Sequence, residues 1–341
     1  MPELLDVFNG DAFSVVSLTN SINTSPHRPQ RLGEMGLFTE QGIDTTHVAL
    51  QLENETLKLV DNKARGGVPQ PNDSTPSRLL SLQVPHLPVY DAMLADEVQN
   101  IRTFGVADAA AGQRMAIESK VQKKLGQMRG KIEVTIEFHR VGALKGVILD
   151  ANGTTVIYNL FTQFGVTQQS ANLVMNTVGT DVPAQFRAAV RLLEASLGST
   201  VYTRLKALVG SSLMDKLQAH ASIKTTMLAN QQDARMLREE DLRYGALRVG
   251  NVIVEEYRGV VGGVPFIDPA EGYLFAEGVP DLFITYFAPA DYIETVNTEG
   301  RPFYSKQEPK RMGKGIDIEA QSNPLSICTR PASVIKLKEN T

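Results

Sequence analysis

The stretch AAAGQRMAIESKVQKKLGQMRGKIEVTIEFHR, residues 109–140, carries the longest periodic pattern in this chain and decides the fold. Its apolar residues recur at steps of three and four, namely Met115, Val121, Leu125, Met128, Ile132 and Ile136. This spacing predicts one helix of about 45 Å with a single apolar stripe. Gly126 and Gly130 weaken the helix by roughly 1 kcal/mol each relative to Ala. We expect one face to lie on a sheet and the other to meet solvent or neighbours.

Composition predicts a folded protein with more than one lobe. The chain has 341 residues, which is more than one compact core usually holds. Apolar residues make up 42% and charged residues 21%, as in ordinary globular proteins. The formal net charge of −4 argues against a protein that grips nucleic acid by its phosphates, because such proteins carry a basic excess.

Cysteine content and hydropathy narrow the class further. Cys328 is the only cysteine, so neither an intrachain disulfide nor a thiolate metal cluster is available, which fits a reducing cytoplasm. The N-terminal MPELLDVFNG carries Glu3 and Asp6 and does not resemble a secretory signal. No apolar run approaches the roughly 20 residues that span a bilayer, so we expect no membrane association.

The segments before the long helix are poor in elements that fold alone. Residues 1–44 are rich in polar residues, Pro and Gly, and we expect them to run extended as an arm. The arm's Leu32, Met35, Leu37 and Phe38 need burial, which docking onto a neighbour would supply. Residues 45–60 alternate apolar and polar side chains and predict a hairpin with its turn at 53–55. Since an isolated hairpin is marginal in water, we expect it to project and to pack against another chain.

The rest of the chain predicts mixed α/β structure, and the whole is therefore α+β. Asp91 is expected to cap a short helix over residues 92–100. GVILDANGTTVIYNLF predicts a hairpin with its turn at 150–153, and Asp181 and Gly198 bound another helix. TRLKALVG reads as a buried strand and SSLMDKLQAH as the helix after it, while further strands follow to the C-terminus.

The sequence shows no motif that carries catalysis or binds a metal or cofactor. The five histidines have no HxxxH or HExxH spacing. Cys328 lies in a strand pattern, where a buried hydrophobe is expected rather than a nucleophile. Ser211 and Ser212 follow a strand but lack the glycine spacing of a nucleophile elbow, and a helix N-cap is favoured. GVVGGVPF matches neither phosphate-binding glycine pattern.

Residues 286–306, YFAPADYIETVNTEGRPFYSK, form the densest cluster of functional residue types. Asp291 and Glu294 are expected on one side of a turn, where a carboxylate pair suits acid–base chemistry if a cleft and a partner are present. No motif ties a His, Lys or Ser to this pair. A contact between subunits is the preferred interpretation, and a hydrolase centred on Asp291 and Glu294 stays open as an alternative.

The order of these segments resembles the lambda-type (E-type) major capsid proteins of tailed double-stranded DNA phages. The segments that carry the likeness are SLTNSINTSPHRPQRLGEMGLF, TTHVALQLENETLKLV with ARGG, RVGALKGVILDANG, FAPADYIETVNTEGRPFYSK and QSNPLSICTRP. They span nearly the whole chain in the family's order. The likeness is specific because of this order, since no single motif would suffice.

This resemblance implies the Hong Kong 97 capsid fold. Its N-arm would be residues 1–44 and its projecting E-loop residues 45–88. The peripheral domain, with the spine helix, would be residues 89–175 completed by 305–325, its sheet taking in 146–160 and 316–322. The axial domain, built on a mixed sheet, would be residues 176–304 completed by 326–341.

The resemblance also implies a function without catalysis. The chain would form pentamers and hexamers of an icosahedral shell around phage double-stranded DNA, assembled in the host cytoplasm, with no cofactor and no enzymatic activity. Expected partners are the chain itself, a portal protein, a scaffold and a decoration protein. The residues expected at contacts between subunits are Arg31, Val48, Leu50, Leu52, Arg65, Asp291, Glu294 and Arg301. An encapsulin-like compartment that packages a cargo protein is the alternative within shell proteins.

Overall fold

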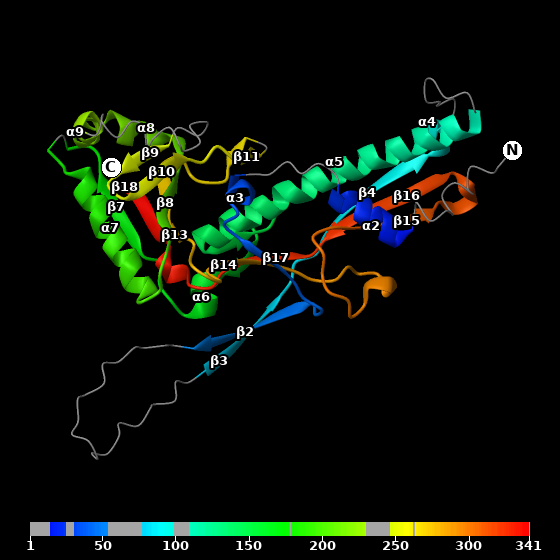
Figure 1. The fold of residues 1–341 in the computed structure, drawn as a ribbon, viewed down its shortest axis with the longest axis horizontal. Coiled ribbons are helices and arrows are strands. Elements are labelled where there is room, and N and C mark those ends of the chain that lie inside the picture. The colour runs from blue at the N-terminus through cyan, green and yellow to red at the C-terminus, as the bar shows by residue number, and fades with distance from the viewer. Residues whose placement is uncertain are drawn as a thin grey trace, which may run out of the picture.

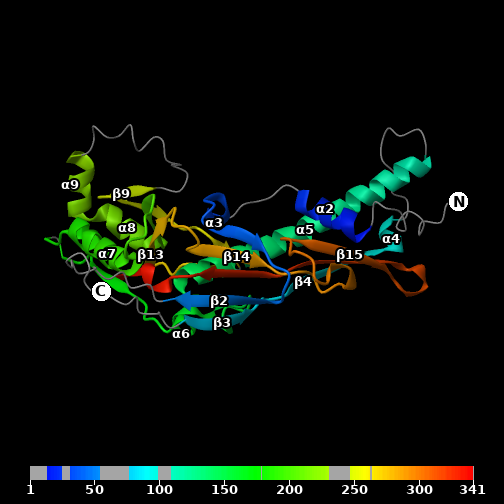
Figure 2. The same ribbon diagram turned by 60° about the horizontal axis from the view of Figure 1, so that its bottom comes forward.

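A computed structural model of the chain describes residues 14–24, 31–53, 77–98, 109–177, 179–229, 246–261 and 263–340. The molecule is an elongated plate with one lobe at each end (Figures 1 and 2). One lobe is built around the long helix α5 (Ala109–Lys145), and the other around a six-stranded sheet. Among the helices described, none has the length and apolar character that a membrane span requires.

Helix α5 confirms the predicted spine and is longer than expected at its C-terminal end, at Lys145. Five of the six predicted stripe residues are buried, namely Val121, Leu125, Met128, Ile132 and Ile136. The prediction was wrong for Met115, which is 52% exposed. Gly146 ends the helix with a φ of +81°, a left-handed conformation that glycine adopts without strain.

The apolar stripe of α5 lies on a three-stranded antiparallel sheet with the order β15-β16-β4. The strands are β4 (Leu87–Leu94), β15 (Tyr304–Pro309) and β16 (Gly315–Ser322). Ile316, Ile318 and Ala320 alternate along β16 and pack against the stripe. Helix α2 (Val15–Thr24) adds Leu18 and Ile22 to this core and packs on β15.

The second lobe is a mixed sheet with the order β7-β18-β13-β8-β10-β9. Its strands are β7 (Ser170–Val174), β8 (Arg204–Val209), β9 (Leu247–Val249), β10 (Val252–Glu256), β13 (Glu271–Glu277) and β18 (Ile335–Asn340). Helices α7 (Val182–Leu197) and α8 (Ser211–Ala219) pack on it, and α9 (Ala221–Ala229) contacts both helices. The predicted ends of α7 are confirmed, with Asp181 as N-cap and Gly198 as C-cap. Gly210, and neither Ser211 nor Ser212, takes the N-cap of α8.

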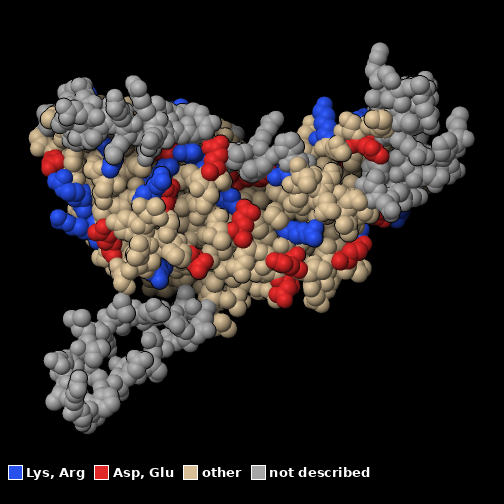
Figure 3. Space-filling view, in the orientation of Figure 1, with Lys and Arg blue, Asp and Glu red and all other residues tan. Residues whose placement is uncertain are grey.

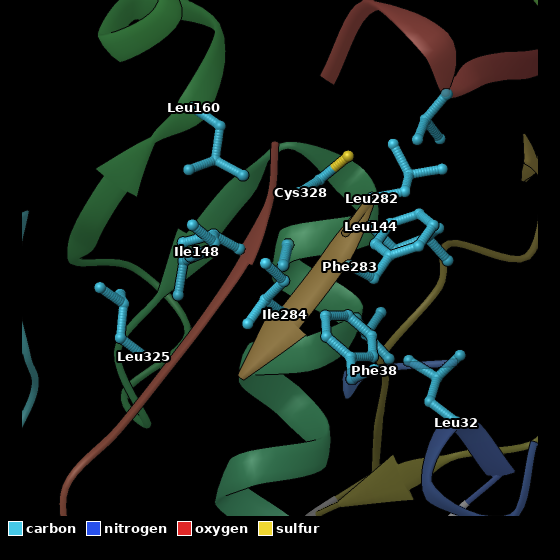
Figure 4. Packing of buried hydrophobic residues seen from close by; sticks show 14 of the residues in the cluster. Leu32, Phe38, Leu144, Ile148, Leu160, Leu282, Phe283, Ile284, Leu325 and Cys328 are labelled. Carbon is cyan, nitrogen blue, oxygen red and sulfur yellow. The ribbon is translucent and has the colours of Figure 1, made fainter. Parts of the chain in front are cut away.

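A third core joins the two lobes. Strands β14 (Phe283–Phe287) and β17 (Pro324–Cys328) pair antiparallel, and β1 (Thr39–Gly42) from the arm adds in parallel to β14. Figure 4 shows Phe38 beside Phe283 and Ile284 of β14, with Leu144 of α5 nearby. The Phe38 and Phe283 ring centroids are 5.3 Å apart. Cys328 is fully buried in this core, as the sequence predicts.

The remaining elements are short. They are α3 (Arg31–Glu34), α4 (Ala95–Val98), α6 (Leu160–Phe164), and the hairpins β2 (His47–Glu53) with β3 (Ser77–Gln83), β5 (Val147–Leu149) with β6 (Val156–Asn159), and β11 (Val260–Val261) with β12 (Val264–Pro265). Single 3₁₀ turns occur at η5 (Ile293–Thr295), η6 (Arg311–Gly313) and η7 (Pro331–Ser333).

Four expectations from the sequence were wrong in detail. The arm is not wholly extended, because residues 15–24 form α2. Strand β2 runs through Glu53, where the sequence predicted a turn, and pairs with residues 77–83; the expected partner strand, residues 57–60, lies outside the described residues. Residues 92–94 belong to strand β4 and not to a helix, because they pair with β16. Residues 146–160 form a hairpin of their own and do not join the β15-β16-β4 sheet.

Candidate functional site

Residues 288–301, hereafter the 288–301 loop, connect β14 to the segment that leads into β15. The loop is held along its length by hydrogen bonds to the neighbouring return strands. The Ala288 N–H donates to the Asn323 carbonyl at 2.9 Å, and the Asp291 N–H donates to Gln321 Oε1 at 3.3 Å. Within the loop, the Thr295 hydroxyl donates to the Ala290 carbonyl at 2.8 Å. The loop is therefore a built feature with a fixed shape.

The loop closes at Gly300, where no side chain fits. A Cβ on Gly300 would lie 1.9 Å from the Phe287 carbonyl oxygen, so any larger residue would displace the backbone. The Gly300 N–H donates to the Ile43 carbonyl at 2.9 Å, and the Ile43 N–H donates to the Phe287 carbonyl at 2.9 Å. These bonds tie the loop to the arm of the same chain.

The charged groups of the loop form ion pairs and hydrogen bonds typical of a protein surface and not of a catalytic site. Lys306 Nζ donates to both carboxylate oxygens of Glu294, at 2.8 and 3.0 Å, which lowers the pKa of this exposed carboxyl. Arg301 Nη1 lies 3.3 Å from the Asn20 side-chain oxygen on α2. Tyr292 donates to Glu319 Oε1 at 3.3 Å, and burial raises the pKa of its phenol, so it stays protonated. Asp291 is exposed. This set contains no general base held against a nucleophile.

Two apolar side chains of the loop were missed by sequence reasoning. Ile293 is 91% exposed and Val296 is 62% exposed. They lie among charged and polar residues without a helical or strand periodicity, so the sequence pattern did not predict their exposure. The carboxylates are the more conspicuous residues in the sequence, although the exposed apolar pair is the less ordinary feature of a folded surface.

The arm is anchored by a buried network of charges. Arg31 makes a two-pronged ion pair with Glu255 on β10, and Lys206 Nζ lies 2.9 Å from the same carboxylate. The Glu255 side chain is 2% exposed. Arg31 thus meets a carboxylate of its own chain. The Leu32 N–H donates to Glu137 Oε1 of α5 at 2.8 Å, and burial raises the pKa of that carboxyl.

Apolar residues of the arm and of the β2–β3 hairpin are also buried within their own chain. Leu32 is 0% exposed, Phe38 7% and Val48 5%, and Leu50 packs against the same core. The expectation that the arm and hairpin need a neighbour to bury these residues was wrong, because β14, β17 and the end of α5 supply the core. The Leu52 side chain and all of Arg65 lie outside the residues that the structure describes.

The described part of the chain offers no metal centre. Within it, no group of three or more His, Cys, Asp or Glu side chains is placed to hold a metal ion. A cavity of about 450 Å³ borders the arm network and is lined in part by Arg31, Lys206 and Glu277. In this cavity Lys206 pairs with the carboxylates of Glu255 and Glu277.

Comparison with known proteins identifies the family. The family model described as phage major capsid protein E matches residues 14–339. The chain is 26% identical to the major capsid protein of Pseudomonas phage KPP10, over 96% of this chain and 97% of that protein. It is 24% identical to the major capsid protein of Salmonella phage Felix O1, over 96% of both chains.

Solved structures agree on the fold. A capsid protein of a prophage of E. coli CFT073 superposes with a TM-score of 0.55 at 12% identity, covering 96% of this chain and 99% of that chain. The capsid of the myovirus phage XM1 gives a TM-score of 0.50 at 9% identity, covering 93% and 94%. Both are phage capsid folds, in line with the Hong Kong 97 architecture that the sequence implied.

Family and geometry agree, since the 288–301 loop lacks a catalytic arrangement and the family is structural. The hydrolase alternative is thereby set aside, as is the cargo compartment. The chain belongs to the phage major capsid protein E family and is a structural protein that forms the head shell of a tailed phage.

Proposed function

We propose that the shell is built from pentamers and hexamers of this chain that close into an icosahedron around double-stranded DNA. The observation that carries this proposal is the β2–β3 hairpin. Its strands run away from the plate (Figure 1), and they are still paired at Glu53 and Ser77, where the described residues end. Such a hairpin offers a neighbouring subunit an extended surface.

The proposed domain boundaries follow the implied fold. They give an arm at 1–44, an E-loop at 45–88, a peripheral domain at 89–175 with 305–325, and an axial domain at 176–304 with 326–341. Separate apolar cores under α5 and around the six-stranded sheet support this division. Strand β4 begins at Leu87, so it crosses the proposed border at 88 by two residues.

The proposed contacts between subunits involve the hairpin and the 288–301 loop. Leu50, Leu52 and Arg65 belong to the E-loop, and Asp291, Glu294 and Arg301 to the loop or its exit. Arg31 and Val48 act from within their own subunit, by fixing the arm and the base of the hairpin. Both remain part of the proposed contact, Arg31 beside the arm and Val48 at the base of the hairpin.

Further partners are part of the proposal. A portal protein, a scaffold and a decoration protein would complete a head assembled in the host cytoplasm. The enclosed DNA would be held without sequence-specific binding. The formal net charge of −4 supports this, because a strongly basic wall would bind DNA tightly and nonspecifically.

A shortened hairpin tests the proposal. Because Glu53 pairs with Ser77, residues 54–76 can be replaced by Asn-Gly, which closes a two-residue hairpin turn. Deleting all of 45–88 is unsuitable, because Val48, Leu80 and Leu82 belong to the core. We expect the shortened chain to fold with an unchanged melting temperature and to form no closed shells by electron microscopy. Normal shells would refute the proposed role of the hairpin.

The unmodified chain provides the second measurement. Purified particles should be closed shells with five-fold and six-fold capsomers in electron micrographs. Particles from infected cells should contain nuclease-protected DNA. Particles filled with a protein cargo, or a soluble monomer under all assembly conditions, would contradict the proposal.

A further inference from the structure

The 288–301 loop presents an apolar surface that the described part of its own chain leaves uncovered. Ile293 and Val296 are 91% and 62% exposed. The backbone that carries them is held by the hydrogen bonds from Asp291 and Tyr292 to β16. Three residue steps, along the 3₁₀ turn and its C-cap, separate Ile293 from Val296, or about 6 Å along the axis of the turn. A rigid loop that holds two apolar side chains in solvent is prepared for a partner, because little ordering entropy remains to be lost on binding.

The loop is also acidic around this pair. Asp291 and Glu299 are exposed, whereas the Glu294 carboxylate is already bound by Lys306. Figure 3 shows Asp and Glu side chains gathered along the lower edge of the molecule, the edge on which the loop lies in Figure 1. The partner surface should therefore be open, partly apolar and basic.

The solvent-facing side of α5 fits this description. Gly126 and Gly130 lie one turn apart in the middle of the helix, where glycine is unfavourable. A Cβ at either position would meet nothing within 4 Å. Gly142 is different, since its Cβ would lie 3.0 Å from the Val147 carbonyl oxygen. Packing among the described residues thus explains Gly142 but gives no reason for Gly126 and Gly130.

These two glycines line a groove of about 1130 Å³, hereafter the α5 groove. Beside the glycines it is lined by Lys123, Met128 and Lys131 of the same helix and by Tyr90 and Asp91 of β4. Lys123 and Lys131 are exposed beside the glycines. Four residues of α-helix span about 6 Å, so the spacing of the two glycines matches that of Ile293 and Val296.

A chain cannot fill its own groove with its own loop. Ile318 and Ala320 of β16 face α5, whereas the alternate residues Glu319 and Gln321 accept hydrogen bonds from the loop. The loop and α5 therefore lie on opposite sides of the sheet. Figures 1 and 2 both separate the loop, after β14, from α5 at the opposite edge.

We propose that Ile293 and Val296 of one subunit dock into the α5 groove of the next subunit, with Asp291 and Glu299 facing Lys123 and Lys131. The two surfaces differ and lie on opposite edges, so the contact is head-to-tail and generates a ring when its rotation closes. The inference rests on the proposed function, because a ring of subunits is what a capsomer requires.

Filling the groove gives the first test. Gly126→Leu adds a side chain where the subunit has open space and glycine is costly, so the melting temperature of the unassembled subunit should stay the same or rise. The yield of closed particles should fall by about tenfold or more, since the apolar pair can no longer enter. Glu118→Leu is the matched control, being exposed on the same helix outside the groove, and should assemble normally.

Reversal of charge gives the second test. Lys123→Glu with Lys131→Glu should reduce assembly, and adding Asp291→Lys with Glu299→Lys in the same chain should restore it. Rescue is expected only if the four residues meet between subunits.

Crosslinking locates the contact directly. A chain with Ile293→Cys and Gly126→Cys should give disulfide-linked ladders up to pentamers and hexamers under mild oxidation, while each single variant should not. The native Cys328 is fully buried and does not interfere. Normal particles from Gly126→Leu, or particles of the double-cysteine chain without ladders, would overturn the inference and leave the proposed function standing. Absence of particles from the unmodified chain would overturn the proposed function itself.

Discussion

Glu255 is a single carboxylate that neutralises two cations, Arg31 from the arm and Lys206 from β8. Its side chain is 2% exposed, and loss of its charge leaves Arg31 with the longer contact to Glu34 at 3.4 Å and Lys206 with that to Glu277 at 3.9 Å. We expect Glu255→Gln to lower the free energy of unfolding of the subunit by about 3–5 kcal/mol in denaturant titrations. Glu256→Gln is the control, because Glu256 pairs with the exposed Arg258 and should cost less than about 1 kcal/mol. Equal effects would mean that the arm network contributes no more than a surface pair.

His139 makes the subunit sensitive to acid. It is 1% exposed, and its Nε2 has no hydrogen-bond partner among the described residues. Burial lowers its pKa from 6.5 to about 4, although the charge of Asp150 acts in the opposite direction. Between these values the unfolded chain takes up a proton that the folded chain does not. Burying the neutral ring therefore costs no protonation free energy above about pH 6.5, and the free energy of unfolding of the subunit decreases as the pH falls towards 4.

The acid sensitivity is measured by comparing denaturant midpoints at pH 7 and pH 4.5. His139→Gln does not titrate, so the loss between the two values should be smaller in this variant, by about 2–3 kcal/mol. His47→Gln, at an exposed position, should lose as much as the unmodified subunit. If His139→Gln keeps the full pH dependence, other groups are responsible.

Helix α5 shows at the scale of an element why the three glycines in its C-terminal two-thirds are not equivalent. The Cβ of an alanine at 142 would lie 3.0 Å from the Ile148 Cα and from the Val147 carbonyl oxygen, because β5 turns back over the helix there. We expect Gly142→Ala to lower the free energy of unfolding by about 1–2 kcal/mol, since the clash outweighs the gain in helix propensity. Gly130→Ala, with open space, should raise it by up to about 1 kcal/mol. A stabilising Gly142→Ala would contradict this packing.

The elements that the sequence predicted well are those with a local cause. The stripe of α5 and the caps of α7 at Asp181 and Gly198 need no distant partner to be recognised. Strand β2 was predicted, but its partner was not, because pairing with residues 77–83 crosses a long intervening segment. Likewise β4 is a strand only because β16 pairs with it. The loop's exposed Ile293 and Val296 could not be predicted, since exposure depends on what the rest of the chain fails to cover.

The whole molecule is held together by the core between its lobes. This core gathers Leu32 of the arm, Leu80 of the hairpin, Leu144 of α5, Tyr273 of the six-stranded sheet and Cys328 of β17. Each region of the proposed capsid fold thus contributes to one shared cluster. A subunit built in this way should not release its arm or its hairpin without disturbing the contact between the two lobes.

Cys328 reports on that core, because it is the only thiol of the chain and is fully buried. Burial raises its pKa to about 12, so the folded subunit presents almost no thiolate to a labelling reagent at neutral pH. We expect labelling of Cys328 to begin only where the far-ultraviolet circular dichroism of the subunit is lost, with one shared denaturant midpoint, because every region depends on the same cluster. An added exposed cysteine at Val201, which is 81% exposed, should react at once in the folded subunit and shows that the reagent is active. Labelling of Cys328 at a clearly lower denaturant concentration than the loss of helix would mean that the lobes separate before they unfold, and that the shared core is not what makes the subunit one unit.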